Sequence, residues 1–222
     1  MLRSECKLIS GAIPQFKFYD EGEHDAALFD YQKEVVSLDM LRAHADPFYN
    51  ECRAYGRLRE AGLDGKVAVR CHGYTTLPAA MESELEERFD VTDWERDDYD
   101  DPIEKRECFR AIVKDLIRDD VRLTHRLVKK MKKDLVQIRK LGIYPSDIKR
   151  TNYKKGILID FSSAITEPNY YFDILRDSQV ERLKKVDLIQ FDKMIEDEKI
   201  KTWIRGTSTR NEEYCKKLRP RL

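Results

Sequence analysis

The chain has 222 residues, of which 41% are hydrophobic and 38% are charged. This length suits one domain built of two lobes and is too short for two independent domains. No stretch approaches the roughly 20 apolar residues that a membrane-spanning helix needs, and the amino terminus lacks the apolar core of a signal peptide. The five cysteines show no CxxC spacing, and the four histidines form no metal-spaced cluster. We therefore expect an intracellular protein with reduced thiols and no zinc site.

The 42 basic and 42 acidic residues cancel overall, but they are segregated along the chain. Asp and Glu dominate residues 82–107, whereas Lys and Arg dominate residues 122–155. The basic stretch would attract phosphates, acidic peptides or the acidic stretch of the same chain. If the acidic stretch is mobile, it would shield the basic one until a partner displaces it. Two separately solvated faces are the alternative interpretation.

The first 45 residues form an atypical amino-terminal segment. A strand is expected at Gln15–Tyr19, and it carries Lys17. The glycines of this segment, Gly11 and Gly22, are isolated, so no glycine-rich phosphate loop is present.

A helix is expected directly after this segment. Asp46 is suited to the N-cap, Pro47 to the first helical position, and apolar residues recur at helical spacing until Gly62. Two strands follow, at 66–73 and 109–116, because both stretches have strand composition. The residues between them, about 75–108, are too many and too charged for a hairpin turn, which indicates an insertion that is partly disordered or partly helical.

The clearest helix covers residues 123–141. Its leucines, Met131 and Ile138 fall on one face, and Gly142 is a suitable C-cap. Residues 180–200 predict one last amphipathic helix. The chain then ends in a basic tail, 201–222, of which 210–222 is expected to be mobile.

The most informative motif lies between these two helices. Asp147, Lys149 and Asn152 have the spacing DxKxxN, and Asp160-Phe161 closes the apolar run 157–159. Residues 152–160 predict two short strands joined at Lys155-Gly156, an arrangement that brings Asn152 and Asp160 side by side. An isolated DxKxxN is common, and surface Asp, Lys and Asn usually face water. The Asp-Phe pair at this distance favours a functional site.

This motif resembles the phosphoryl-transfer site of protein kinases. The resemblance implies an α+β, abbreviated kinase-like fold of two lobes, with an incomplete small lobe at 46–117 and a shortened large lobe at 118–200, whose catalytic-loop-like segment spans 143–162. The chain departs from kinases in having Pro145-Ser146 where they have His-Arg, and Ser162 where they have glycine.

The resemblance also implies a role for each candidate residue. Asp147 would accept the proton of the attacking hydroxyl, Lys149 would contact the transferring phosphate, and Asn152 with Asp160 would hold magnesium. Glu51 of the first helix, in preference to Glu60, would pair with a strand lysine, and Lys17 is the candidate for the lysine that contacts the phosphates of ATP. A solvated Glu51 or one paired within its own helix is the alternative.

A narrower resemblance rests on five strings. They look like the fungal Sim4 kinetochore-complex subunit family, itself kinase-like, over roughly residues 46–175; the strings are 46–58, 67–74, 110–115, 142–153 and 158–162. This resemblance implies a nuclear, kinetochore-associated role with kinetochore subunits as protein partners, no membrane, and no direct reading of nucleic acid. A strand ending in a lysine would be expected just before Phe16, where this chain has Ala12-Ile-Pro-Gln15.

Two classes of function follow. One is a degenerate kinase fold, a pseudokinase, that serves as an interaction subunit of a kinetochore complex. The other is an active minimal kinase that uses ATP and magnesium to phosphorylate a protein or a small molecule. The missing glycine-rich loop favours the first, because backbone amides over the phosphates supply much of the stabilisation that phosphoryl transfer needs.

Overall fold

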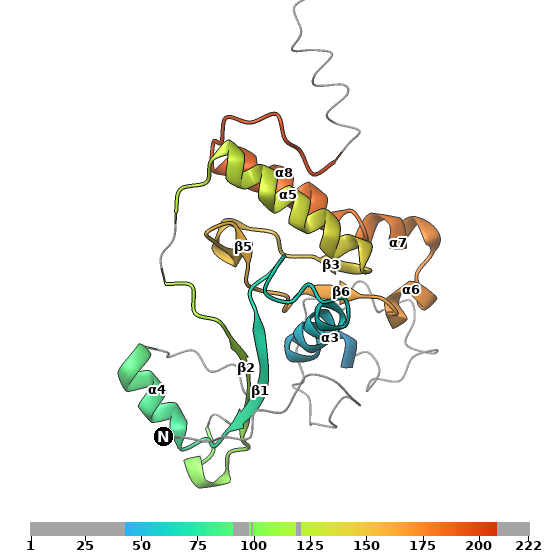
Figure 1. Cartoon of the computed structure of the whole chain (residues 1–222). Coiled ribbons are helices and arrows are strands. Elements are labelled where there is room, and N and C mark those ends of the chain that lie inside the picture. Colours follow the sequence, from blue (N-terminus) through green and yellow to red (C-terminus); the bar gives the residue numbers. More distant parts are fainter. Residues whose placement is uncertain (1–42, 91–97, 99, 119–120, 208–222) are drawn as a thin grey trace, which may run out of the picture.

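The computed structural model describes residues 43–90, 98, 100–118 and 121–207 (Figure 1). Helices and small antiparallel sheets are mixed along the chain, so the predicted α+β class is confirmed. The helices are α3 (Pro47–Glu60), α4 (Met81–Phe89), α5 (His125–Lys140), α6 (Tyr170–Ile174), α7 (Asp177–Leu183) and α8 (Val186–Asp197), with short 3-10 turns η1 (Ile103–Lys105) and η2 (Arg150–Asn152). The strands are β1 (Cys71–Leu77), β2 (Phe109–Lys114), β3 (Ile143–Pro145), β4 (Tyr153–Lys154), β5 (Ile157–Leu158) and β6 (Ala164–Thr166).

The expected first helix is α3. Its N-cap is Asp46, whose side chain accepts hydrogen bonds from the backbone N–H groups of Phe48 and Tyr49, and Pro47 occupies the first helical position. The chain leaves the helix through Gly62, which has a φ of +63° that glycine adopts without strain. The sequence prediction for this element is confirmed.

The two predicted strands pair with each other, but the first begins later than expected. β1 and β2 are antiparallel, with Cys71 opposite Lys114 and Leu77 opposite Phe109. Residues 66–70, predicted to lie in the strand, precede it. The apolar side chains of Val67 and Val69 are buried there because this stretch runs beside β5, where Val69 N donates to the carbonyl oxygen of Leu158.

The insertion between these strands is partly helical, as expected. α4 occupies its beginning, and the Glu82 side chain is buried there against Arg106, with 2.7 Å between the carboxylate and the guanidinium. Figure 1 shows α4 at the end of the β1–β2 pair that lies away from α5. The described helix of the acidic insertion therefore does not lie against α5, and the expected shielding of the basic stretch stays a prediction.

The core lies on both sides of the β3–β6 ribbon. α3 packs on β6 from one side, while α5 and α8 lie on the other side against β3 (Figure 1). The predicted helix at 123–141 is confirmed as α5, with Thr124 at its N-cap and Gly142 after its end at a φ of +73°. Its buried stripe and the buried face of α8 share one apolar cluster: Val128, Met131, Leu135, Ile138, Phe191, Met194 and Ile195.

The single helix predicted at 180–200 is wrong. The chain forms α7 and α8 instead, and it breaks between them at Lys184 and Lys185. The Lys184 ammonium lies 2.6 Å from a Glu167 oxygen and over the rings of Tyr144 and Phe172. These contacts hold Lys184 against β3 and α6, whereas α8 begins two residues later and packs along α5. The tertiary contacts therefore interrupt a sequence pattern that is continuously helical.

The first residues of the predicted tail are docked. His125 Nδ1 lies 2.7 Å from Thr202 Oγ1, and Lys132 Nζ donates to the carbonyl oxygen of Gly206. Both carboxylate oxygens of Asp192 accept hydrogen bonds from Gly206 or Thr207. Residues 201–207 therefore belong to the folded unit, and the predicted mobile segment 210–222 lies outside the described residues.

Gly206 sits where a side chain does not fit. A Cβ at this position would lie 2.2 Å from the carbonyl oxygen of Leu188. We expect Gly206→Ala to displace this segment from α5 and α8 and to lower the free energy of unfolding by about 1–3 kcal/mol, the usual cost of overpacking. Urea unfolding measures this loss. A loss below about 0.5 kcal/mol, the usual range for a surface substitution, would contradict it.

Candidate functional site

The centre of the candidate site is an ion pair between α3 and β2. Lys114 Nζ lies 2.8 Å from Glu51 Oε1 and 3.0 Å from Glu51 Oε2, and it also donates to the carbonyl oxygen of Ile159 at 2.9 Å. An ammonium group has three protons, so these three acceptors use its full donor capacity. The lysine that pairs with the helix glutamate is therefore Lys114, which was predicted to lie in a strand but was not among the predicted site residues.

The same glutamate fixes the segment around Asp160. Glu51 Oε1 accepts a hydrogen bond from the backbone N–H of Phe161 at 2.8 Å, and Asn50 Nδ2 donates to the carbonyl oxygen of Ser162 at 2.9 Å. With the bond from Lys114 to Ile159, α3 and β2 hold the backbone on both sides of Asp160. We name Glu51, Lys114 and the backbone groups of 159 and 161 the clamp.

The clamp is buried, and burial affects its charge. Glu51 is 6% exposed, and desolvation raises the pKa of its carboxyl group, while the neighbouring Lys114 and the Phe161 N–H act in the opposite direction. Tyr55 and Phe161 pack edge to face at 5.2 Å beside it, and the Lys114 ammonium lies 5.8 Å from the Tyr55 ring centre. Removal of either charge would therefore leave the other without its partner in a poorly hydrated site.

The DxKxxN residues contact one another. Asn152 Nδ2 donates to the backbone oxygen of Asp147 at 2.9 Å and to its Oδ2 at 3.1 Å, while Lys149 Nζ lies 2.6 Å from the same Oδ2. Lys149 is exposed, and its hydrogen bond to Asp147 is the main cause that raises its pKa; the charge of Asp160 acts in the same direction. Lys149 is therefore close enough to interact electrostatically with both Asp147 and Asp160, and Asn152 contacts the same Asp147 carboxylate.

The predicted hairpin is present. β4 and β5 pair with Tyr153 opposite Leu158, and Ile159 N donates to the carbonyl oxygen of Asn152 at 3.0 Å. The turn uses Lys155 and Gly156, both at positive φ, and a Cβ on Gly156 would lie 2.7 Å from Leu127 Cγ of α5. The hairpin therefore brings the backbones of Asn152 and Asp160 next to each other and rests on α5. Asp160 itself accepts a hydrogen bond from Ser162 N at 2.8 Å.

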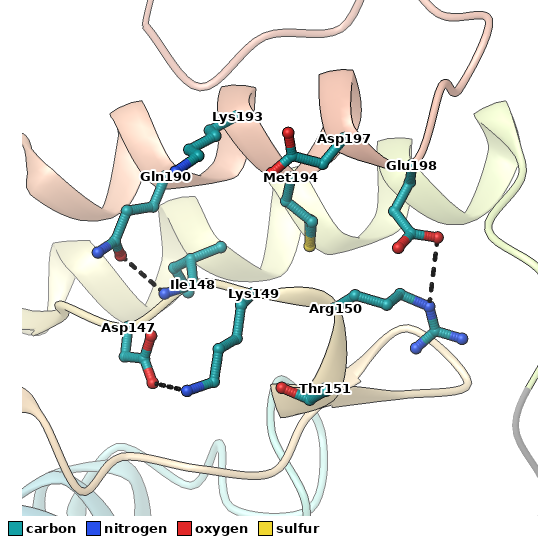
Figure 2. Close-up of a pocket in the computed structure, with 10 residues that line it drawn as sticks. All are labelled: Asp147, Ile148, Lys149, Arg150, Thr151, Gln190, Lys193, Met194, Asp197 and Glu198. Atoms are coloured by element: carbon teal, nitrogen blue, oxygen red, sulfur yellow. Dashed lines mark hydrogen bonds and ion pairs between the residues drawn. The ribbon is translucent and has the colours of Figure 1, made fainter.

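A pocket of about 410 Å³ opens beside this loop (Figure 2). It lies between residues 147–151 and α8, with Ile148 and Met194 as apolar lining and Gln190 accepting a hydrogen bond from Ile148 N at 2.8 Å. Its other lining residues are polar: Asp147, Lys149, Arg150, Thr151, Lys193, Asp197 and Glu198. Asn152 and Asp160, the two proposed magnesium ligands, do not line it.

Part of the expected nucleotide site lies outside the described residues. Lys17 falls in the amino-terminal segment, so its role as the phosphate-contacting lysine stays a prediction, as do the proposed roles of Glu51, Asp147, Lys149, Asn152 and Asp160. Lys114 was missed because the kinase order places the paired lysine before the helix, whereas here it follows Glu51 by 63 positions. The sequence signal that could have found it is the position of Lys114 at the end of the predicted strand.

Magnesium would need oxygen ligands from this loop. One carboxylate oxygen of Asp160 already accepts a hydrogen bond from Ser162 N. The amide nitrogen of Asn152 donates to Asp147 Oδ2. Among the described residues no group of three or more His, Cys, Asp or Glu side chains is arranged to hold a metal ion. Asp160 and Asn152 could together offer at most a partial set, to which phosphate oxygens and water would have to be added. The described residues also contain no helix long and apolar enough to cross a membrane.

Comparison with known proteins gives one result. A family model described as kinetochore Sim4 complex subunit FTA2 matches residues 3–165, more than half of the chain. No curated protein and no solved structure matches the chain. The match covers all five strings on which the Sim4 resemblance rests, and it extends to the amino-terminal segment. The chain therefore belongs to the family of kinetochore Sim4 complex subunits named FTA2.

Proposed function

We propose that this chain is a non-catalytic, kinase-like interaction subunit of a nuclear kinetochore complex. The family description supports a protein that works within a complex. The kinase-like part of the proposal is supported by the clamp together with the DxKxxN loop, since kinases likewise pair a strand lysine with a helix glutamate beside the Asp-Phe segment. In this proposal the two lobes correspond to residues 46–117 and 118–200.

The main support for a non-catalytic role is that all three protons of the Lys114 ammonium group are used in hydrogen bonds within the protein. In a working kinase the strand lysine pairs with the helix glutamate and also contacts the phosphates of ATP. Here the third proton of Lys114 goes to the carbonyl oxygen of Ile159. The lysine therefore connects β2, α3 and the Asp160 segment to one another, and a phosphate would have to compete with that backbone bond. A cation used in this way stabilises a scaffold.

The catalytic-loop residues are similarly engaged with each other. Asp147 Oδ2 contacts both Lys149 Nζ and Asn152 Nδ2. The proposed base, Asp147, is therefore bound to the proposed phosphate contact, Lys149, and to one proposed metal ligand, Asn152. This arrangement also favours a structural use of the loop.

An active minimal kinase is the second candidate. The Lys114–Glu51 pair favours it, because assembly of such a pair is a condition of kinase activity. Asp147 at the edge of the 410 Å³ pocket would then face a hydroxyl substrate in that pocket. In this case Lys149 would leave its contact with Asp147 and bind the transferring phosphate. Asn152 and Asp160 would hold the Mg²⁺ of ATP.

Nucleotide binding separates the two candidates. For the scaffold we expect millimolar ATP with magnesium to raise the melting temperature by less than about 2 °C, because weak binding contributes only RT ln(1 + [L]/Kd). Differential scanning fluorimetry with magnesium chloride alone as the control measures the shift, and Asp147→Asn should leave co-purification with the complex unchanged. A shift above about 5 °C that needs magnesium and disappears in Asp160→Ala would contradict the expected weak binding and favour the enzyme instead.

A further inference from the structure

The outward face of α5 carries a row of exposed cations, which we name the basic stripe. Its members are Arg126, Lys129, Lys130, Lys133 and Lys140. At about 3.6 residues per turn they cover about a third of the helix circumference and about 21 Å of its length. The buried side chains of α5, such as Met131 and Leu135, lie on the opposite side of the helix. The basic stripe therefore faces solvent along nearly the whole of α5.

Most of this charge is not neutralised by the described residues. Lys130 pairs with Asp134 of the same helix, with 2.6 Å between Nζ and Oδ2. In the part of the chain that the structure describes, no carboxylate forms an ion pair with the other four cations of the basic stripe. α4, the described helix of the acidic insertion, lies away from α5 (Figure 1). Its own exposed Arg88, by contrast, lies 2.8 Å from Glu84 one turn away.

The arrangement of these charges lowers the stability of α5. Like charges three or four positions apart on a helix repel each other, as Lys129 does with Arg126 on one side and Lys133 on the other. Positive charges near the start of a helix also oppose its dipole, and the first turn of α5 contains no acidic residue that would offset them. A helix face that served only solubility would carry charges of both signs interspersed. The basic stripe therefore does not stabilise the helix that carries it.

Three features favour a protein helix over a nucleic acid as the anionic partner. Val136 is 37% exposed and lies within the stripe between Lys133 and Lys140, where it suits a partner that also has apolar side chains. The 42 basic and 42 acidic residues of the chain cancel, whereas domains that bind nucleic acid through a basic surface are usually basic overall. A second helix has the same rise per residue as α5, so carboxylates at every third or fourth position match the spacing of the cations.

We propose that the basic stripe is the docking surface for an acidic amphipathic helix of a partner protein. The partner helix lies along α5, with Asp or Glu side chains opposite the cations and one apolar side chain against Val136. Its carboxylates supply the compensating charge that α5 lacks. The inference rests on the proposed role of the chain as an interaction subunit, and it names the surface and the class of partner.

A designed peptide tests the surface directly. The probe is a fluorescein-labelled, alanine-rich helix that carries glutamates at three- and four-residue spacing on one face, with one leucine among them. We expect fluorescence anisotropy to show that the probe binds the full chain at low ionic strength and that binding weakens as salt is added. A peptide of the same composition, with the glutamates scattered around the helix, should bind at least about threefold more weakly, because fewer ion pairs form at once.

Lys129→Glu tests the stripe in a variant that should fold. The new carboxylate lies three positions after Arg126 and four positions before Lys133, which is the favourable order for a pair within a helix, so α5 should be at least as stable. The variant should bind the probe about tenfold more weakly, because an attractive contact becomes a repulsive one. Lys66→Glu, at an exposed lysine outside α5, makes the same change in net charge and should bind the probe like the unchanged protein.

Equal affinity of Lys129→Glu and Lys66→Glu for the probe would overturn the proposal. So would a DNA duplex that binds more tightly than the probe and loses its affinity in Lys129→Glu, a result that assigns the stripe to nucleic acid. Co-purification of the full chain with the kinetochore complex separates this inference from the proposed function. A complex that assembles equally with both variants overturns the docking surface alone, whereas an unchanged chain that does not co-purify contradicts the proposed function and, with it, the partner.

Discussion

Lys114→Met is expected to lower the free energy of unfolding by about 3–5 kcal/mol, because breaking a buried ion pair leaves the other charge buried without compensation. Glu51 is 6% exposed and would keep only the Phe161 N–H as its donor, while the Ile159 carbonyl oxygen would lose its bond to Lys114. Urea unfolding followed by circular dichroism measures the loss. Lys66→Met, at an exposed lysine, is the matched control and should change stability by less than about 0.5 kcal/mol.

The pH dependence of this variant tests the cause. The folded-state pKa of Glu51 is already above its unfolded value through burial, and loss of the Lys114 charge raises it further. A carboxyl group of this kind favours the folded state below its unfolded pKa, and that contribution is lost as the pH rises through the folded pKa. The deficit of Lys114→Met should therefore shrink as the pH falls from 7 toward the unfolded pKa of Glu51. A deficit that is constant with pH would assign the loss to packing alone.

Arg139→Met is expected to be comparably destabilising, by about 3–5 kcal/mol, for the same reason at the contact between α5 and α8. Arg139 Nη1 contacts both Asp187 Oδ1 and the carbonyl oxygen of Lys184, and the Asp187 side chain is completely buried. Desolvation raises the pKa of Asp187, and Arg139 provides the main opposing effect. Urea unfolding again measures the change.

Lys140→Met, at the exposed next position of α5, is the control for this variant. The double variant Arg139→Met/Asp187→Leu should recover part of the loss, since a buried pair replaced by apolar residues is often neutral or better. If Arg139→Met and Lys140→Met unfold at the same urea concentration, the Arg139–Asp187 pair does not hold α8 on α5.

Local sequence signals predicted the elements whose determinants are local. Asp46 and Pro47 predict the start of α3, and the apolar spacing together with Gly142 predicts α5 and its end. Two short strand-forming runs predict the hairpin that turns at Lys155-Gly156. Each depends on residues within a few positions of one another, where capping, periodicity and turn chemistry act. The choice of Glu51 rather than Glu60 also agrees with burial, because Glu51 faces the core and Glu60 is exposed.

The features that were missed depend on distant partners. Lys114 joins Glu51 across 63 positions, and nothing in the strand 109–114 shows which carboxylate it will meet. The break between α7 and α8 is caused by contacts of Lys184 with Glu167, Tyr144 and Phe172. Periodicity gives no information about such contacts, since they are set by tertiary packing.

The clamp also has a consequence for synthesis of the chain. Glu51 and Phe161 are 110 positions apart, so α3 leaves the ribosome long before the backbone that it must hold. At about 5–20 residues per second the helix waits on the order of ten seconds for its last partner. During that time its glutamate remains in water and its apolar face lacks the β6 contacts. A chaperone, or an assembly partner present during translation, would therefore act on a species in which α3 is formed and the clamp is still open.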